Sequence, residues 1–277
     1  MLLKKKIKVA VISDVHLGTY GCDAKALYHY LKSIEPEILI LNGDIIDIWQ
    51  FSKNYWPDSH MKVVQRIFKM MSRGTKVYYL TGNHDEMLRK FTDFKMGKLE
   101  VLNKLVLELD GKKAWIFHGD VFDITMKNSK WLAKLGAVGY DTLIMLNSVV
   151  NWFSQKMGRG KLSFSKKIKN GIKNAIKFID DFEQTAIDIG IEKGYDYVIC
   201  GHIHQPANRL VQTEKGSIIY LNSGDWIENL TALEYNENKW ELIHFKAGLN
   251  EASDQIEEEI NEEDRLKMEN LFKSIVN

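Results

Sequence analysis

Cysteine is scarce in this 277-residue chain, which carries only Cys22 and Cys200. Two thiols cannot form the disulfide framework of many small secreted proteins, so we expect a reducing compartment. An excess of one charge is also absent, because 38 basic residues balance 37 acidic ones and leave a formal net charge of +1. Proteins built mainly to bind nucleic acid usually carry a strong basic excess. The composition therefore argues against nucleic acid as the main partner.

Long apolar runs are missing as well. The basic start of the chain is followed by an uninterrupted apolar run only at residues 9–12. A signal peptide needs about 7 to 15 apolar residues, and a membrane-spanning helix needs about 18. We therefore expect a cytoplasmic protein, either free or peripheral on the inner face of the cytoplasmic membrane.

Apolar runs alternate with helical patterns through the first 120 residues. Strands are expected in the β-branched runs, and helices where apolar residues recur every three to four positions. The predicted order is strand 7–13, helix 24–34, strand 37–42, helix 61–72 and strand 76–81. Such alternation is typical of βαβ units with parallel strands.

The remaining chain changes character twice. Residues 101–109 and 113–117 are predicted to pair as a hairpin around Asp110-Gly111, a dipeptide favoured in tight turns. A helical pattern over residues 126–190 follows. Further strands are then predicted at 197–200, 207–212, 217–222, 231–235 and 239–244.

These elements predict an α/β protein of three parts. The core comprises residues 1–125 and 191–250, and a helical insertion, or cap, spans residues 126–190. Residues 251–277 form an acidic tail that is expected to be helical. The simplest architecture is two packed sheets flanked by helices and interrupted by the insertion.

Five short polar motifs follow predicted strands, each at the carboxyl end of its strand. Ligands of α/β sheets normally bind at this edge. Glycines within the motifs permit tight turns and a close approach of the backbone to a ligand. The motifs are Asp14-Val15-His16, Gly43-Asp44, Gly82-Asn83-His84-Asp85, His118-Gly119-Asp120 and Gly201-His202-Ile203-His204.

The side chains of these motifs are carboxylates, an amide and imidazoles. Such donors suit divalent manganese, iron or zinc, and the absence of cysteine ligands argues against a structural zinc site. A carboxylate can bridge two ions about 3.5–4 Å apart. Two such ions lower the pKa of a water molecule and neutralise phosphate oxygens during in-line attack. The motifs therefore predict a phosphoesterase with two divalent ions, manganese being the most favoured.

No single motif carries this prediction. An aspartate after a strand is commonly a turn or helix-capping residue, and a lone histidine is commonly hydrogen-bonded in the core or at the surface. All five motifs in order, each after a predicted strand, are much harder to explain in this way. The other histidines, His29, His60 and His244, are expected to have ordinary structural roles.

In this order the motifs resemble those of the calcineurin-like metallophosphoesterase superfamily, over about residues 5–245. The resemblance implies a four-layer α/β/β/α sandwich. It implies that His84 is the general acid or transition-state stabiliser, a role that suits a near-neutral imidazole, and that Asp85 orients it. The ligands implied for one metal are Asp14, His16, Asp44 and His204, and those for the other are Asp44, Asn83, His118 and His202.

Finer features resemble one branch, the UDP-2,3-diacylglucosamine pyrophosphatases of lipid A synthesis. These features are residues 13–18, 43–49 and 222–226 and the insertion after His118. The branch implies cleavage of UDP-2,3-diacylglucosamine to UMP and diacylglucosamine 1-phosphate. One departure concerns His84, because the best-known members of the branch carry Gly-Asn-Arg-Asp at this motif. The histidine form is the general form of the superfamily.

The insertion mixes basic and apolar residues. Over residues 126–177 it has eleven lysines and arginines against Asp141 alone. This pattern suits an anionic lipid-nucleotide substrate or an anionic membrane surface. The alternative is a core helix with a solvated lysine face, on which the acidic tail docks. By resemblance, the residues contacting the diphosphate or sugar are Arg159, Ser165, Lys166 and Lys169.

Two other functions compete with this prediction. One is a phosphodiesterase or phosphatase for a soluble phosphoester. The other is a scaffold that kept the fold and lost catalysis, and the sequence argues against it because no ligand is missing from the motifs.

Overall fold

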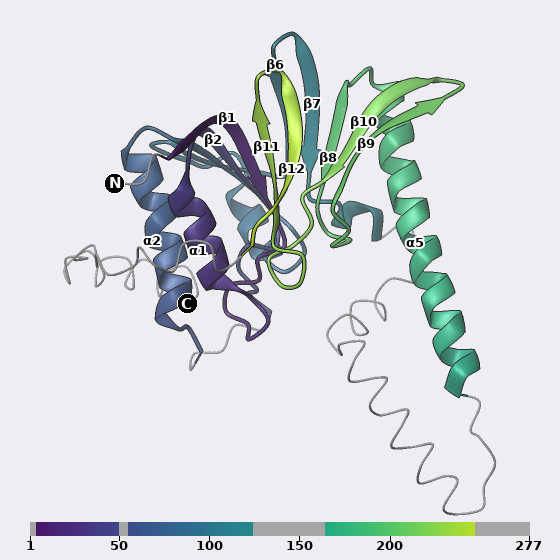
Figure 1. The fold of residues 1–277 in the computed structure, drawn as a ribbon, viewed down its shortest axis with the longest axis horizontal. Coiled ribbons are helices and arrows are strands. Elements are labelled where there is room, and N and C mark those ends of the chain that lie inside the picture. Colours follow the sequence, from purple (N-terminus) through teal and green to yellow (C-terminus); the bar gives the residue numbers. More distant parts are fainter. Residues whose placement is uncertain (1–3, 50–54, 124–163, 247–277) are drawn as a thin grey trace, which may run out of the picture. The chain divides into compact units, whose positions relative to one another are not determined.

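The computed structural model describes residues 4–49, 55–123 and 164–246 (Figure 1). Over these residues the predicted mixed α/β fold is confirmed, with two β-sheets and a few helices. Met1–Phe245 forms one compact unit. No described helix is long and apolar enough to cross a membrane.

The larger sheet contains seven strands. They are β1 (Lys5–Ile12), β2 (Ile34–Asn42), β3 (Lys76–Leu80), β4 (Lys95–Met96), β5 (Leu99–Leu102), β11 (Thr231–Asn236) and β12 (Lys239–His244). Their order across the sheet is β12-β11-β1-β2-β3-β5-β4. β1, β2 and β3 run parallel, as the βαβ pattern predicted, and β5 also runs parallel to β3.

The smaller sheet contains five strands. They are β6 (Lys104–Leu109), β7 (Lys112–Phe117), β8 (Tyr197–Cys200), β9 (Ala207–Thr213) and β10 (Gly216–Asn222), in the order β6-β7-β8-β10-β9. β7, β8 and β10 are parallel. The carboxyl ends of these three strands therefore meet at one edge of this sheet, as the carboxyl ends of the parallel strands do in the larger sheet.

The prediction of one strand over residues 101–109 is wrong. The chain passes from the larger to the smaller sheet at this point, between β5 and β6. Only the polar pair Asn103 and Lys104 separates the two apolar segments, and side chains from both segments pack against the same core. The predicted hairpin is confirmed as β6–β7, with φ of 51° at Asp110 and 78° at Gly111. Positive φ at both central residues is the requirement of a type I′ turn.

Side chains of both sheets share one apolar core. Val9, Ile40 and Leu80 of the larger sheet pack with Ile116 and Ile199 of the smaller one. Burial of each such side chain contributes about 1.5–3 kcal/mol. This core holds the two sheets together and thereby fixes the loops at their carboxyl ends.

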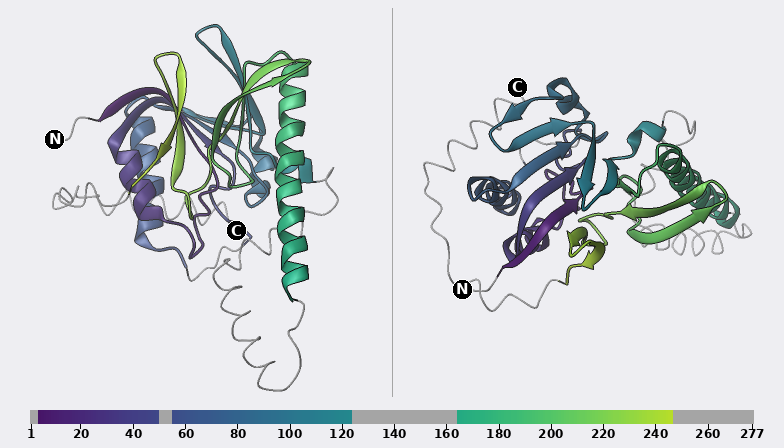
Figure 2. Two further views of the ribbon diagram at one scale, coloured as in Figure 1. Left: turned by 45° about the vertical axis from the view of Figure 1, so that its right-hand side comes forward. Right: turned by 90° about the horizontal axis from the view of Figure 1, so that it is seen from above.

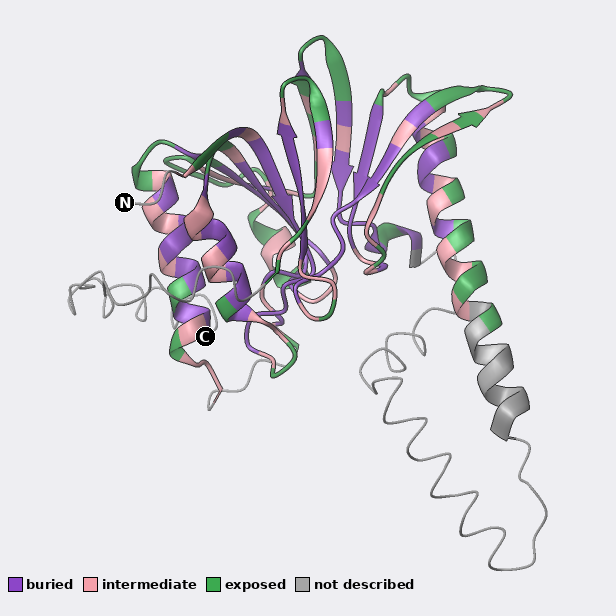
Figure 3. Ribbon diagram, in the orientation of Figure 1, coloured by how far each residue is buried: buried purple, intermediate pink, exposed green. Residues whose placement is uncertain are grey.

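Helices cover the other faces of the sheets. α1 (Ala24–Ser33) and α2 (Asp58–Ser72) pack together against the larger sheet, as Figures 1 and 2 show. α5 (Phe164–Glu192) packs against β8 and β10. Phe182 and Ala186 of α5 are buried there, and Figure 3 shows buried positions alternating with exposed ones along the carboxyl-terminal part of this helix.

Part of the predicted insertion lies outside the described residues, as does the acidic tail. Residues 164–190 are helical within α5, which continues to Glu192, beyond the predicted end. The division into a core, an insertion and a tail remains a prediction.

Candidate metal centre

The five motifs lie at the strand ends where the sequence predicted them. β1, β2 and β3 of the larger sheet and β7 and β8 of the smaller sheet each end within two residues of a motif. Backbone hydrogen bonds link the loops, from Asp14 N to Gly43 O at 3.1 Å and from Gly201 N to His118 O at 2.9 Å. Trp226 N also donates to Asp14 O at 3.1 Å, which joins the loops of the two sheets.

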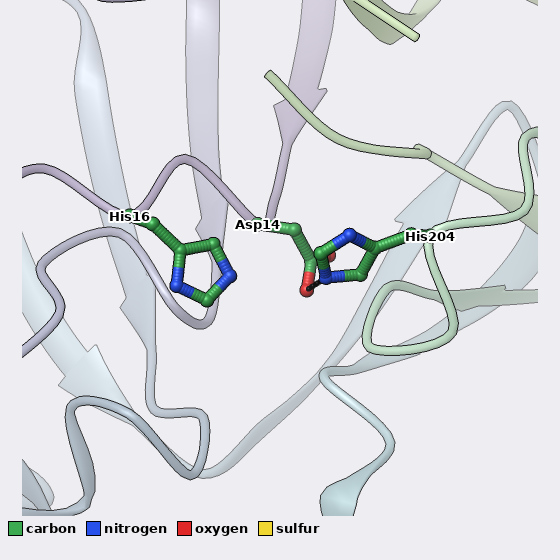
Figure 4. Close-up of side chains that lie close together, drawn as sticks. All are labelled: Asp14, His16 and His204. Atoms are coloured by element: carbon green, nitrogen blue, oxygen red, sulfur yellow. Dashed lines mark ion pairs between the residues drawn. The ribbon is translucent and has the colours of Figure 1, made fainter. Parts of the chain in front are cut away.

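The motif side chains gather into overlapping groups of potential metal ligands. Within each group, one ligand atom per residue lies within 4.8 Å of the others. Figure 4 shows the first group, in which the His204 ring lies against the Asp14 carboxylate and the His16 ring faces the same space. The groups are Asp14, His16 and His204; Asp44, His118 and His202; and His16, Asp44 and His84. Because the third group joins the other two, the arrangement suits two ions.

The backbone orients the Asp14 carboxylate. His202 N donates to Asp14 Oδ2 at 3.0 Å, which leaves Oδ1 directed at the centre. His204 Nε2 lies 3.2 Å from this Oδ1, without hydrogen-bond alignment. One oxygen is thus held by the protein, and the other is available to a cation.

The Asp44 carboxylate is held in the same manner. His84 N donates to Asp44 Oδ1 at 2.8 Å, and His118 Nε2 lies 3.2 Å from Asp44 Oδ2. His118 Nδ1 contacts Asn42 O at 2.9 Å. A backbone carbonyl can only accept, so His118 carries its proton on Nδ1 and presents Nε2 to the centre.

Several buried atoms of these motifs have no hydrogen-bond partner. A buried polar group without a partner is uncommon and costs about 1–3 kcal/mol. The unpaired atoms include Asp14 Oδ1, His16 Nε2, Asn83 Oδ1 and His118 Nε2. All four are typical ligand atoms for manganese, iron or zinc. The residues therefore fit a pair of divalent cations, which would satisfy these atoms.

Five candidate ligands have left-handed backbone conformations. Non-glycine residues rarely have positive φ, and such strain tends to cluster at functional sites. The φ values are 51° at Asp14, 55° at His16, 53° at Asp44, 68° at His202 and 53° at His204. The loops are therefore shaped to turn ligand side chains inward rather than to minimise local strain.

Two motif glycines are required by the closeness of these ligands. A Cβ at Gly82 would lie 2.2 Å from Asp44 Oδ1, and one at Gly43 would lie 2.4 Å from the His118 ring. No side chain fits at either position. Glycine is therefore required at both positions, because any side chain would clash with a predicted metal ligand.

Charge coupling shifts the pKa values of the buried pairs. Burial opposes ionisation of Asp14, but the adjacent His204 outweighs it and holds the Asp14 pKa at about 2. Burial likewise opposes protonation of His204, yet the Asp14 charge raises the His204 pKa to about 9. The same coupling lowers the pKa of Asp44 and raises that of His118. Because imidazoles ligate metals when neutral, metal binding must displace protons here.

The carboxylate that contacts the His84 ring is Asp47. Its Oδ2 is hydrogen-bonded with His16 Nδ1 at 3.3 Å and lies 2.9 Å from His84 Nδ1, although these last two atoms are not aligned for a hydrogen bond. One carboxylate oxygen therefore holds both a candidate metal ligand and the candidate acid. The sequence contained a signal for it, because Asp47 closely follows Asp44 within the segment that resembles the pyrophosphatase branch.

Asp85, which was expected to orient His84, has a different set of contacts. Its Oδ2 accepts hydrogen bonds from the Tyr79 hydroxyl at 2.6 Å and from Ile45 N at 3.0 Å. Its Oδ1 accepts one from Gly82 N at 2.6 Å. Burial, with the nearby Asp44 charge, raises the Asp85 pKa to about 6. Asp85 therefore braces the loop that carries Asn83 and His84.

Sequence reasoning also missed two supporting residues. Arg89 forms an ion pair with Asp120 and donates to Gly82 O at 3.4 Å, which ties two motif loops together. Asp225 Oδ2 lies 3.9 Å from His204 Nδ1. Asp225 belongs to the segment 222–226 that carried the resemblance, so its position could have been inferred.

The predicted substrate-binding residues are not brought to the centre by any described contact. Arg159 lies outside the described residues. Ser165, Lys166 and Lys169 fall in α5, whose backbone alone is described there. Their role stays a prediction.

Comparison with known proteins gives matches over most of the chain. The model of the calcineurin-like phosphoesterase family matches residues 7–206. A UDP-2,3-diacylglucosamine hydrolase of Aliivibrio fischeri is 25% identical over 240 residues, covering 84% of this chain and 97% of the relative. The Vibrio cholerae enzyme of that name is 24% identical over 237 residues, covering 82% and 93%.

Solved structures give only distant matches. An archaeal phosphodiesterase is similar at a TM-score of 0.41 and 14% identity, covering 86% of this chain and 99% of its own. The family assignment comes from the sequence match. That match, over residues 7–206, shows that this chain is a hydrolase belonging to the calcineurin-like phosphoesterase family.

Proposed function

We propose that this chain hydrolyses the diphosphate of UDP-2,3-diacylglucosamine, releasing UMP and diacylglucosamine 1-phosphate. The observation that most directly supports this reaction is the overlap of the ligand groups around Asp14 and Asp44. Several buried oxygen and nitrogen atoms of these groups have no hydrogen-bond partner. The substrate is supported by the names of the relatives and by their coverage of most of the chain.

Two divalent ions, manganese being the most favoured, would be held by the predicted ligands. Asp14, His16, Asp44 and His204 would hold one, and Asp44, Asn83, His118 and His202 the other. Such ions supply positive charge to the phosphate oxygens and lower the pKa of the attacking water. Asp44 fits the bridging role because it is the carboxylate that two of the ligand groups share.

His84 would donate a proton to the leaving group or stabilise the transition state. Asp47 contacts its Nδ1, which leaves Nε2 for a phosphate oxygen. Burial opposes protonation of His84, but the contact with Asp47 outweighs it and raises the His84 pKa. His84 therefore holds a proton more readily than an ordinary histidine, as a general acid requires.

A soluble phosphodiester or phosphomonoester is the second candidate substrate. The observation that favours it is His84 itself, where the better-known pyrophosphatases carry arginine. The same metal centre would serve either substrate, and the difference would lie in the groups that bind the rest of the molecule.

The proposed substrate places the chain at the inner face of the cytoplasmic membrane. In this proposal the lysine-rich insertion over residues 126–190 caps the core and contacts the anionic substrate, with Arg159, Ser165, Lys166 and Lys169 as the binding residues. The pattern of apolar and basic residues supports this role.

Turnover of two substrates tests the proposal. The manganese-loaded chain is given UDP-2,3-diacylglucosamine in mixed micelles and, separately, bis-para-nitrophenyl phosphate, with Asp44→Ala as the inactive control. We expect release of UMP from the lipid at a kcat/KM far above that for the soluble ester. Efficient turnover of the soluble ester alone would favour the second candidate, and no turnover of either would refute both.

A further inference from the structure

One buried histidine outside the five motifs bonds directly to a loop that carries proposed metal ligands. His60 lies in the first turn of α2 and is only 2% exposed. Its Nδ1 accepts a hydrogen bond from Gly18 N at 2.9 Å. Gly18 follows His16, a proposed ligand, by two residues. The contact indicates a more specific role for His60 than the ordinary structural one that was expected.

The bond from Gly18 completes a run of paired backbone amides over residues 14–18. Each of the four preceding amides donates to a backbone carbonyl of the neighbouring loop after β2. These bonds are Asp14 N to Gly43 O at 3.1 Å, Val15 N and His16 N to Asp44 O, both at 2.9 Å, and Leu17 N to Ile45 O at 2.9 Å. Gly18 N bonds instead to a side chain, and that side chain comes from α2. His60 therefore ties the end of the ligand loop to a helix.

The Gly18 amide needs this acceptor because the loop is buried and its backbone is left-handed. Gly18 is buried with a φ of 99°, and His16 has a φ of 55°. A buried amide without a partner costs free energy comparable to a lost hydrogen bond. Left-handed conformations at non-glycine residues persist only where surrounding contacts fix them. The His60 bond is such a contact, and it lies directly after the strained ligand His16.

The bond requires His60 to be neutral. A backbone amide can only donate, so Nδ1 must be unprotonated and the proton of the ring must be on Nε2. Burial lowers the pKa of His60, which favours this neutral form. The rings of Tyr55 and Trp56 lie edge-on to the imidazole, with centroids 5.9 and 5.6 Å from it. These neighbours restrict the rotation of the ring that presents Nδ1 to the loop.

A second contact joins the same two segments. Tyr20, two residues after Gly18, stacks with Tyr55 at a centroid distance of 3.7 Å. The Tyr20 ring is 84% exposed, whereas the bond between His60 and Gly18 is buried. The loop after His16 is therefore anchored at the start of α2 by one exposed contact and one buried contact.

The anchored loop also sets the position of Asp47. Asp47 N donates to Leu17 O at 2.9 Å, and Asp47 Oδ2 is hydrogen-bonded with His16 Nδ1 at 3.3 Å. Displacing Gly18 would therefore shift Leu17, and with it both His16 and the carboxylate that holds the His16 ring. The ligands of the other proposed ion, apart from the shared Asp44, lie on other loops. Loss of the bond should therefore affect one ion more than the other.

We propose that His60 is a positioning residue for one metal ion, the ion assigned to His16 and His204. It acts through Gly18, by holding the His16 loop in the conformation that binds the metal. The inference rests on the metal centre of the proposed function, but not on the identity of the substrate. Contacts that orient metal ligands typically change metal affinity by about 10–100-fold.

Manganese binding by the full chain tests this role. The affinities of the two sites are measured by titrating the chelated wild type, His60→Leu, His60→Asn and Met70→Ala. Leucine removes the acceptor, whereas asparagine keeps one, because its Oδ1 is attached to Cγ as Nδ1 is. Met70 provides the matched control, because it is buried at the other end of α2 and its truncation destabilises the same helix.

We expect one site of His60→Leu to bind manganese about tenfold more weakly, and its other site to change by no more than about threefold. Both sites of His60→Asn and of Met70→Ala should stay within about threefold of wild type. Hydrogen exchange at the Gly18 amide of the chelated chain reports the bond itself, and we expect faster exchange in His60→Leu than in His60→Asn.

Three results of the titration would overturn the proposal: unchanged affinities in His60→Leu, equal weakening of both its sites, or a loss as large in His60→Asn or Met70→Ala. If His60→Leu does not fold, nitrogen NMR of the wild-type imidazole decides, because a proton on Nδ1 at neutral pH would contradict the bond. A wild type that binds no manganese would refute the metal centre and this inference together. If the expected difference in affinity is found but no phosphoester is hydrolysed, only the proposed function fails.

Discussion

Two carboxylate–imidazole pairs of the candidate centre have the same separation but different surroundings. His118 Nε2 lies 3.2 Å from Asp44 Oδ2, and His204 Nε2 lies 3.2 Å from Asp14 Oδ1. The His118 side chain is fully buried, whereas 36% of the His204 side chain is exposed. His118 Nδ1 contacts a carbonyl at 2.9 Å, while the nearest Asp225 oxygen is 3.9 Å from His204 Nδ1.

The comparison indicates that the two pairs differ in how tightly they would hold a metal ion. The Asp44–His118 pair is enclosed by the protein, and the His118 ring is held by a hydrogen bond. The Asp14–His204 pair is more exposed to solvent, and the His204 ring has a looser contact. Contacts that fix the orientation of a ligand raise its affinity for the metal. We therefore expect the ion beside His118 to be retained and the ion beside His204 to exchange more readily.

Replacing Asp44, the carboxylate shared by the two proposed metal sites, should abolish the difference in metal retention between them. Asp44→Ala takes a ligand from both proposed ions, so we expect loss of both metals and a fall in kcat/KM of about 10³-fold or more. Elemental analysis and turnover of bis-para-nitrophenyl phosphate measure the two effects. Retention of two ions with normal turnover would exclude Asp44 as the bridge.

Truncating the two imidazoles should reveal the difference between the pairs. His118→Ala leaves a buried charge on Asp44 without its partner, and we expect the metal-free protein to lose about 3 kcal/mol of unfolding free energy. His204→Ala should cost about 1 kcal/mol or less, because water reaches that position. Denaturant unfolding after chelation gives both values, and equal losses would contradict the comparison.

The candidate acid should be separable from the metal ligands. For His84→Ala we expect both metals to remain and kcat to fall about 10²–10⁴-fold. For Asp47→Asn, which weakens the orientation of His84 and His16, we expect a smaller loss of about 10–100-fold. Metal content is measured alongside turnover. An empty centre in His84→Ala would show that His84 is itself a ligand.

Proton release on metal binding is the smallest expected effect. The His204 pKa of about 9 means that this imidazole is protonated at pH 7.5 in the metal-free protein. It must be neutral to ligate, so binding releases its proton, and affinity should fall about tenfold per released proton for each pH unit below 9. Asp14, with a pKa of about 2, stays ionised throughout and releases none. Calorimetry in buffers of different ionisation enthalpy counts the protons; a count of zero would contradict the coupling.

The strand ends and their motifs could be predicted from the sequence because each motif interrupts a local apolar pattern. Asp14, Asp44, His118 and His202 are all located by such interruptions. The crossing between β5 and β6 was missed, since only Asn103 and Lys104 separate the two apolar segments and such a polar pair also occurs within single strands. Whether Asp47 or Asp85 holds His84 depends on how two loops meet in space, which local spacing does not encode.

Metal stoichiometry tests the central claim most directly. The chelated chain is titrated with manganese while bound metal and turnover of bis-para-nitrophenyl phosphate are measured together. The account predicts two ions per chain, with turnover rising only as the second ion binds. A chain that binds one ion or none, or whose turnover is independent of manganese, would contradict it.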